Sequence, residues 1–182
     1  MFPIVALQIE RISFRRQFSG NLKDEEELFV RAFTYGYQNI TKDILKIDNL
    51  NQRLRFVFSE ERIDLNDPKK NIFVIDAYYK DRLVGFISFE EYDPSNKIYI
   101  RALAIDPSFI GKGLGKKLIF ICNDYLPNAK KLILATRACN EKAIGFYKHL
   151  GFQKCEKVPH GWDPARFIGF EYDISDAEIV PA

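Results

Sequence analysis

The chain has 182 residues, 47% of them apolar and 29% charged, so it can bury a core and is too apolar to be disordered. Its 27 basic and 25 acidic side chains nearly balance, which argues against a general nucleic-acid-binding protein and leaves only local anion sites. Three irregularly spaced cysteines and two histidines match neither a disulfide framework nor a metal site, so we expect reduced thiols and no metal.

The N-terminal segment MFPIVALQIERISFRR contains a short apolar run. It lacks the basic start and the cleavage site of a secretory signal, and the run is too short to span a bilayer. We therefore expect a cytoplasmic protein without membrane or nucleic-acid partners. No repeat or linker divides the chain, which indicates a single domain over residues 1–182.

The first half of the chain predicts a strand, two helices and a β-hairpin. Leu28, Phe29, Ala32 and Phe33 recur at helical spacing. The hairpin strands are rich in β-branched and aromatic residues and flank a polar turn. The predicted elements are a strand at Val5–Ser13, helices at Lys23–Gln38 and Lys42–Phe58, and strands at Asn71–Tyr79 and Leu83–Glu90.

The second half alternates strands with helices. Its predicted elements are strand Lys97–Ile105, helix Leu114–Tyr125, strand Lys131–Thr136, helix Asn140–Leu150, and strands Phe152–Val158 and Arg166–Ile174. Antiparallel strands followed by this alternation indicate an α/β fold of the α+β type. We expect a single mixed, mostly antiparallel, twisted sheet of about seven strands with helices on both faces.

A glycine-rich loop, DPSFIGKGLGKKL, joins a predicted strand to a predicted helix. Glycines at 111, 113 and 115 let backbone N–H groups approach an anion, and the positive end of the helix faces the same place. Lys112, Lys116 and Lys117 add charge, so the loop fits a pyrophosphate. The spacing matches neither the nucleoside-triphosphate loop nor the dinucleotide fingerprint. A glycine-rich start of a helix without a ligand is the alternative interpretation.

Two motifs in the second half resemble those of the GNAT superfamily of N-acetyltransferases. The stretch ALAIDPSFIGKGLGKKL is similar to the acetyl-CoA motif of that family, with Ile110 where the family has Gln or Arg. The stretch ACNEKAIGFYKHLGF is similar to the family signature N-x-x-A-x-x-x-Y-x-x-x-G-F. Together they cover about Ile98–Phe152, within a CoA-binding core at about residues 97–158.

The resemblance implies how acetyl-CoA, the acetyl donor, would bind. The pantetheine arm would run beside strand Ile98–Ile105, in a splay between that strand and Lys131–Thr136. The pyrophosphate would rest on the backbone amides of the glycine loop. The implied cofactor-binding residues are Leu103, Ala104, Ile105, Gly111, Lys112, Gly113, Leu114, Gly115, Lys116, Asn140 and Tyr147.

The same resemblance makes Tyr147 the general acid that protonates the departing thiolate; plain helix packing is the alternative. A base is also needed, because an alkylammonium must lose a proton before it attacks. Strands Ile98–Ile105 and Lys131–Arg137 hold no carboxylate. Glu90 and Glu91 are therefore the candidate bases, with Glu171 next, unless these are solvated surface charges.

The expected function is transfer of an acetyl group from acetyl-CoA to a primary amine, directly and in a ternary complex. A non-catalytic CoA-binding domain and an acyltransferase for longer acyl-CoA are the alternatives. By resemblance, two further groups border the acceptor site, although core packing would also explain them. They are Phe33, Tyr35 and Tyr37, and His160, Trp162 and Asp163.

Overall fold

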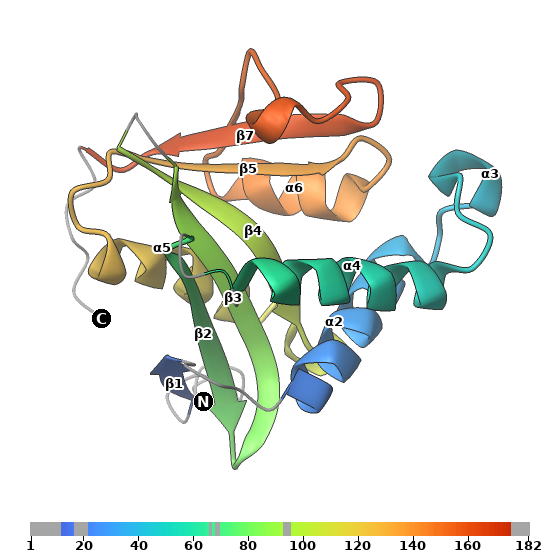
Figure 1. Cartoon of the computed structure of the whole chain (residues 1–182), viewed down its shortest axis with the longest axis horizontal. Helices are drawn as coiled ribbons and strands as arrows, with labels where there is room; N and C mark the ends of the chain where they lie inside the picture. The colour runs from blue at the N-terminus through green and yellow to red at the C-terminus, as the bar shows by residue number, and fades with distance from the viewer. Residues whose placement is uncertain (1–11, 17–21, 66, 68–69, 93–95, 176–182) are drawn as a thin grey trace, which may run out of the picture.

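Seven strands form one sheet in the order β1-β2-β3-β4-β5-β7-β6 (Figure 1). The computed structural model describes residues 12–16, 22–65, 67, 70–92 and 96–175. All neighbouring pairs are antiparallel except β4 and β5, which are parallel. The strands are β1 (Ile12–Arg16), β2 (Ile72–Tyr79), β3 (Arg82–Tyr92), β4 (Lys97–Ile105), β5 (Lys131–Arg137), β6 (Gln153–Lys154) and β7 (Phe167–Asp173).

Helices cover both faces of this sheet, as expected (Figure 1). One face packs against α5 (Leu114–Tyr125) and α6 (Glu141–His149), and the other against α2 (Leu22–Tyr37) and α4 (Leu50–Leu65). The remaining helices are short: α3 (Lys42–Leu45), η1 (Pro107–Phe109) and η2 (Pro159–Gly161). The fold class predicted from the sequence is confirmed.

The sheet separates two hydrophobic cores because successive side chains of a strand point to opposite faces. Ile75, Ile87 and Leu118 are fully buried in the core under α5, and Leu28 is fully buried in the core under α2. Each central strand thus contributes side chains to both cores, and the site described below lies where the two layers meet.

The helix predicted at Lys42–Phe58 is wrong as one element, since the structure divides it into α3 and α4. Lys46 has the left-handed backbone conformation, with φ 55°, and its N–H bonds to the Lys42 carbonyl at 2.7 Å. A residue in this conformation ends a helix. The apolar spacing of the segment hid the break because both helices bury residues against the same core, including Leu45 and Leu54.

Two predicted strands also differ from the structure. The strand predicted at Phe152–Val158 shortens to Gln153–Lys154, because the chain then crosses Gly169 of β7 instead of following its edge. A Cβ at Gly169 would lie 2.8 Å from Pro159 Cδ, so only glycine permits this crossing. The strand predicted at Val5–Ser13 lies outside the described residues except for its last two positions, which belong to β1.

Candidate active site

Strand β4 separates from β5 partway along its length. The parallel pairing runs only from Lys97 opposite Lys131 to Ile100 opposite Leu134. The next residue, Arg101, forms a β-bulge, because Phe89 of β3 pairs with Ile100 while Ser88 pairs with Ala102. A bulge bends its strand and ends regular pairing. The structure therefore contains the splay expected between these strands.

Beyond the bulge, β4 remains paired with β3 on one side only. Leu103 lies opposite Ile87 and Ile105 opposite Gly85. Alternate backbone groups of an antiparallel strand point to its other side, which here faces the splay. Leu103 and Ile105 pack their side chains on the α5 face, whereas Ala104 is buried toward α2. This segment can accept an extended ligand as an additional strand.

The glycine loop begins directly after β4 and is fixed by Asp106. The carboxylate of Asp106 accepts a hydrogen bond from Ser108 N at 2.9 Å and pairs with Arg31 of α2 and Arg82 of β3 at 3.0 and 2.9 Å. Burial by itself raises the pKa of Asp106. The Ser108 hydrogen bonds and the two arginines lower it by more, so the net pKa lies below the ordinary value. The start of the loop is thus tied to both layers.

Backbone conformation in the loop depends on glycine. Gly111 and Gly113 have φ values of 76° and 82°, where a side chain would be strained. The first intrahelical bond of α5 runs from Lys117 N to Gly113 O, at 3.1 Å. The amides of Leu114, Gly115 and Lys116 precede that bond and are available to an anion. Leu114 contributes only its backbone, since its side chain is buried.

Gly115 also has a second role, which the loop motif does not reveal. A Cβ on Gly115 would lie 2.9 Å from Cζ of Phe146, so glycine lets α5 approach α6.

The other side chains of the loop face outward or pack locally. Lys112 places its Nζ 4.9 Å from the centre of the Phe109 ring, and Lys116 is exposed at the start of α5. Ile110, at the position of the family's Gln or Arg, is 48% exposed.

Asn140 and Tyr147 lie at the two ends of α6. Asn140 caps the helix by accepting a hydrogen bond from Ala143 N at 3.2 Å, and it is buried. The buried Tyr147 ring contacts Phe146, Phe152 and Phe170. Burial raises the pKa of Tyr147, with smaller contributions from neighbouring Tyr37 and Tyr99, so the phenol is protonated at neutral pH.

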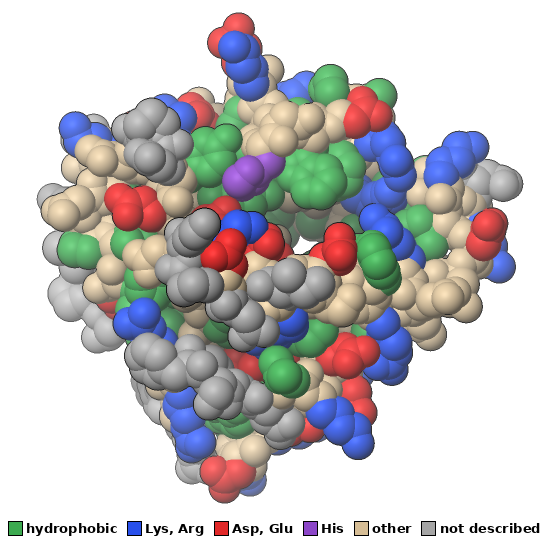
Figure 2. Space-filling model, in the orientation of Figure 1, with side chains coloured by type: hydrophobic (Ala, Val, Ile, Leu, Met, Phe, Trp, Pro, Cys, Tyr) green, Lys and Arg blue, Asp and Glu red, His purple; other side chains and the backbone are tan. Residues whose placement is uncertain are grey.

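A cavity of about 1190 Å³ opens on the α4 face of the sheet. Figure 2 shows this face hollowed, with acidic, basic and hydrophobic side chains and a histidine around the opening. Its lining includes both predicted bases, Glu90 and Glu91, together with Tyr99, Arg101 and His160. A second hollow of about 630 Å³ adjoins it and shares Arg53, Phe56, Trp162 and Asp163.

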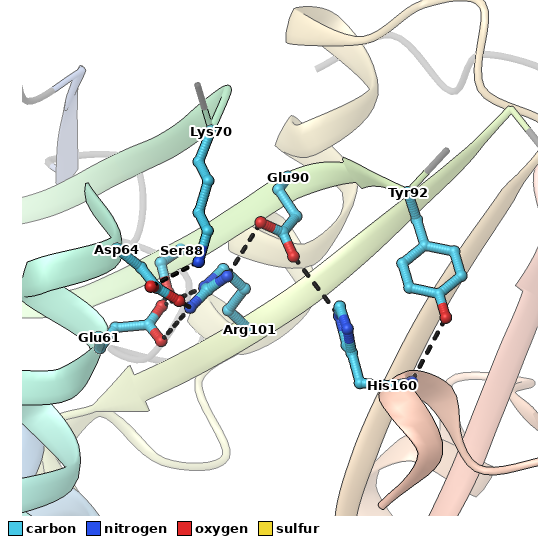
Figure 3. Close-up of polar contacts among 8 residues, drawn as sticks. All are labelled: Glu61, Asp64, Lys70, Ser88, Glu90, Tyr92, Arg101 and His160. Atoms are coloured by element: carbon cyan, nitrogen blue, oxygen red, sulfur yellow. Dashed lines mark hydrogen bonds and ion pairs between the residues drawn. The ribbon is translucent and has the colours of Figure 1, made fainter. Parts of the chain in front are cut away.

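Arg101 organises the charges in the first cavity (Figure 3). Its guanidinium donates to Glu61 and Asp64 of α4 and to Glu90 of β3, with the Glu90 contact at 2.9 Å. A hydrogen bond from Lys70, added to those from Arg101, lowers the pKa of Asp64. The bulge residue is therefore clamped between the sheet and α4.

The predicted bases have different surroundings. Glu90 is 12% exposed and has a partner for each oxygen, the Arg101 guanidinium for one and the His160 imidazole for the other. Glu91 is exposed on the cavity rim. Glu171, the third candidate, pairs with Lys131 at 2.9 Å on β5 and does not line either cavity.

Glu61 and Asp64 belong to the site although no motif marked them. Acids three residues apart share a helix face, which is ordinarily solvated, so the sequence offered no signal for these two. Of the expected aromatic residues, Trp162 lines both hollows, whereas Tyr37 is buried in the α2 core. Burial raises the pKa of Tyr37 to about 12.

The described residues hold no cluster of histidine, cysteine, aspartate and glutamate side chains suited to a metal ion. Nor does any helix in the described part have the length and apolar character needed to cross a membrane.

Comparisons with known proteins agree with this architecture. The sequence profile of the acetyltransferase (GNAT) family matches residues 26–152. The solved PaiA N-acetyltransferase from Thermoplasma acidophilum, in complex with coenzyme A, superposes with a TM-score of 0.71 at 20% identity, over 89% of this chain and 98% of that one. The ribosomal-protein-S18-alanine N-acetyltransferase of Escherichia coli gives 0.62 at 16% identity, over 94% and 99%.

The fold and the splayed strands thus define an acyl-CoA N-acyltransferase architecture, and the chain belongs to the acetyltransferase (GNAT) family. Among curated relatives, the spermine/spermidine N(1)-acetyltransferase of Bacillus subtilis (strain 168) is 35% identical over 88 residues, 43% of this chain and 58% of that protein. N-alpha-acetyltransferase 30 of Schizosaccharomyces pombe is 34% identical over 76 residues, 38% and 51%. The chain spans little more than half the length of these relatives.

Proposed function

We propose that the protein transfers an acetyl group from acetyl-CoA to a primary amine, directly and in a complex that holds both substrates. The observation that carries this proposal is the unpaired side of β4 after Ile100. It lies between the glycine loop, on the α5 face, and the charged cavity, on the α4 face. A donor bound from one face and an acceptor bound from the other would meet at this splay.

The residues present fit the CoA part of the donor. The open side of β4 offers backbone groups to the pantetheine, and the first amides of α5 offer N–H donors to the pyrophosphate. Lys116 and Lys117 add positive charge at the same helix end. The Ile110 side chain has no hydrogen-bonding group, so the backbone amides and the lysines would make the phosphate contacts.

Tyr147 is proposed to protonate the sulfur as the thiolate leaves. Its hydroxyl keeps its proton at neutral pH because burial raises its pKa. The ring is fixed by three aromatic neighbours, which would hold the hydroxyl in one position. A preorganised donor acts most strongly where charge develops in the transition state.

The charge of the cavity favours a cationic acceptor. Its lining contains six carboxylates against three lysine and arginine side chains. This excess attracts a second ammonium group on an acceptor, as in the polyamines named for the Bacillus subtilis relative. We therefore propose a diamine or polyamine as the acceptor class.

Release of thiol from acetyl-CoA tests the activity. We expect release that depends on spermidine and saturates with both substrates. If the protein binds CoA but releases no thiol with any amine, the proposal is contradicted and the protein is a non-catalytic CoA-binding protein. A higher rate with longer acyl-CoA would contradict the acetyl assignment alone.

A pair of matched acceptors tests the charge argument. We compare 1,5-diaminopentane with 5-aminopentanoate, which share the reacting amine and differ in the far group. A preference for the diamine of about tenfold in kcat/KM, or roughly 1.4 kcal/mol, is expected. The adjoining hollow carries Lys46, Arg137 and Arg166, so a preference for the aminocarboxylate would place the far group there instead.

A further inference from the structure

His160 occupies an unusual place in the cavity wall. It lies in η2 with φ 55°, a conformation that is uncommon for a residue with a side chain. Its ring is held edge-on between Tyr92 and Tyr99, with centroids 5.0 and 4.3 Å away, and the backbone N–H of His160 donates to the Tyr92 hydroxyl at 3.3 Å. The side chain remains 39% exposed and lines the cavity. The loop therefore presents an ordered imidazole to an acceptor.

Glu90 is arranged to orient this ring. One of its carboxylate oxygens accepts from Arg101 at 2.9 Å, and the other lies 3.4 Å from Nε2 of His160 (Figure 3). A carboxylate at Nε2 favours the tautomer with its proton there, which leaves Nδ1 as the free proton acceptor. Because Arg101 already engages Glu90, the imidazole is the better-placed group to take a proton.

We propose that His160 is the general base that deprotonates the acceptor ammonium, and that Glu90 is a positioning residue for it. This inference rests on the proposed acetyltransferase function. Tyr99 of β4, the strand that borders the splay, packs its ring against His160 and so places the imidazole next to that strand. The acid and the base would then act from opposite sides of the splay.

The groups around His160 leave it ready to accept a proton. Desolvation lowers its pKa below the ordinary value; Glu90 and Asp64 raise it, while Arg101 and Lys70 lower it, and the net direction is downward. Tyr99 faces the ring without a charge, because burial raises the pKa of Tyr99 to about 12, and the ring of Tyr92 packs edge-on against the imidazole as well. The imidazole is therefore mostly neutral at pH 7 and above.

The proposed step balances as follows. The acceptor R–NH3⁺ gives one proton to Nδ1 of His160 and becomes a neutral amine. Its nitrogen forms a bond to the carbonyl carbon of the thioester, the C–S bond breaks, and the sulfur takes the proton of Tyr147. The amide nitrogen loses its second proton, which restores the tyrosine, and His160 releases the first proton to solvent. The products are the acetamide, CoA thiol and one proton.

His160→Gln tests the base, with His149→Gln as the matched control because His149 is exposed on α6 and is the other histidine of the chain. We expect His160→Gln to lose on the order of 10²-fold in kcat/KM near pH 7.5, with unchanged CoA affinity by calorimetry. The kcat/KM of the wild type should rise with pH and become constant above the pKa of His160. The variant should instead keep rising about tenfold per pH unit toward the substrate pKa of about 10.4, because only free amine reacts.

Nuclear magnetic resonance provides a readout independent of turnover. In the His149→Gln variant the remaining imidazole is His160, whose measured pKa should fall below 6.5 and match the acid limb of kcat/KM. Glu90→Gln should move both values to lower pH together, since it removes the charge that raises them.

Three results would overturn the inference. If His160→Gln turns over at the wild-type rate with an unchanged pH profile, His160 is not the base, and the proposed acetyltransferase function is unaffected. If Glu90→Gln shifts the measured pKa of His160 but leaves the acid limb of the kcat/KM pH profile unchanged, that limb reports the titration of another group. A wild-type protein that acetylates no amine would overturn the proposed function and this inference together.

Discussion

At the scale of single residues, burial and hydrogen bonding set the protonation of the groups around the site. The pKa values of Tyr147 and Asp106 shift in opposite directions, because burial raises the pKa of the phenol, whereas the Ser108 hydrogen bonds and two arginines together outweigh burial for the carboxylate. Both are held by neighbours from other elements. Substitutions that keep their shape therefore separate chemistry from packing.

Tyr147→Phe keeps the ring contacts with Phe146, Phe152 and Phe170 and removes only the hydroxyl. We expect turnover to fall on the order of 10²-fold, because the proton is needed only as the C–S bond breaks. CoA affinity, measured by calorimetry, should change little. Turnover at the wild-type rate would make the tyrosine structural, and a parallel loss of affinity would make its hydroxyl a binding group.

Asp106→Asn retains the hydrogen-bonding shape and removes the charge that holds Arg31 and Arg82. At pH 7 we expect a loss of about 1 kcal/mol in the free energy of unfolding, since both arginines are partly exposed.

The pH dependence follows from the lowered pKa of Asp106 in the folded state. A lowered carboxyl pKa contributes stability above the unfolded value of about 3.9, and this stability is lost as pH falls through the folded pKa. The difference between wild type and variant should therefore shrink toward pH 2 in urea unfolding. A difference that stays constant from pH 7 to pH 2 would contradict the charge role.

At the scale of elements, the contact between α5 and α6 positions the helix start that is proposed to bind the phosphates. Gly115 lies in the first turn of α5 and faces Phe146 of α6. Gly115 therefore allows the packing of two helices, in addition to the backbone approach to phosphate that is proposed from the motif. The sequence motif indicated only the approach to phosphate.

Gly115→Ala should destabilise the fold by about 1–3 kcal/mol, because the new Cβ would lie 2.9 Å from Phe146 and force a shift. Gly145→Ala is the matched control: it lies within α6 with nothing within 4 Å of its Cβ, so it should gain about 0.5–1 kcal/mol. Phe146→Leu should restore part of the Gly115→Ala loss. Equal effects of the two alanines in urea unfolding would argue against the packing role.

At the scale of the whole molecule, charge is local. The net charge of +2 gives little long-range field, so salt should act on CoA binding mainly through the lysines at the start of α5. The acidic cavity and the basic loop lie on opposite faces of the sheet, which would sort a cationic acceptor from an anionic donor.

CoA affinity should weaken roughly tenfold between 50 and 500 mM salt, because screening acts on the phosphate contacts. Replacing Lys116 and Lys117 together by Gln should flatten this dependence. Lys23→Gln, an exposed lysine at the start of α2, should leave it unchanged. Calorimetry across the salt series checks the prediction, and an unaltered slope in the double variant would place the phosphates elsewhere.

The sequence by itself determined the fold class and most element positions in the second half. Local patterns sufficed there: β4 and α5 have the bounds predicted, and α6 differs by one residue at each end. These elements carry strong periodicity, a capping asparagine and glycine boundaries, which act within a few residues of chain. The glycine loop was predicted from its own residues, whereas the role of Tyr147 was implied only by the family resemblance and stays a prediction.

Only the tertiary structure decided which distant residues meet. Arg101 at the bulge pairs with Glu61 and Asp64 of α4, and Glu90 of β3 meets His160 in a loop. These residues come from segments up to 99 positions apart in the sequence. The left-handed conformation of Lys46, which separates α3 from α4, is likewise seen only in the structure. Such contacts depend on three-dimensional proximity and charge balance, which no local pattern encodes.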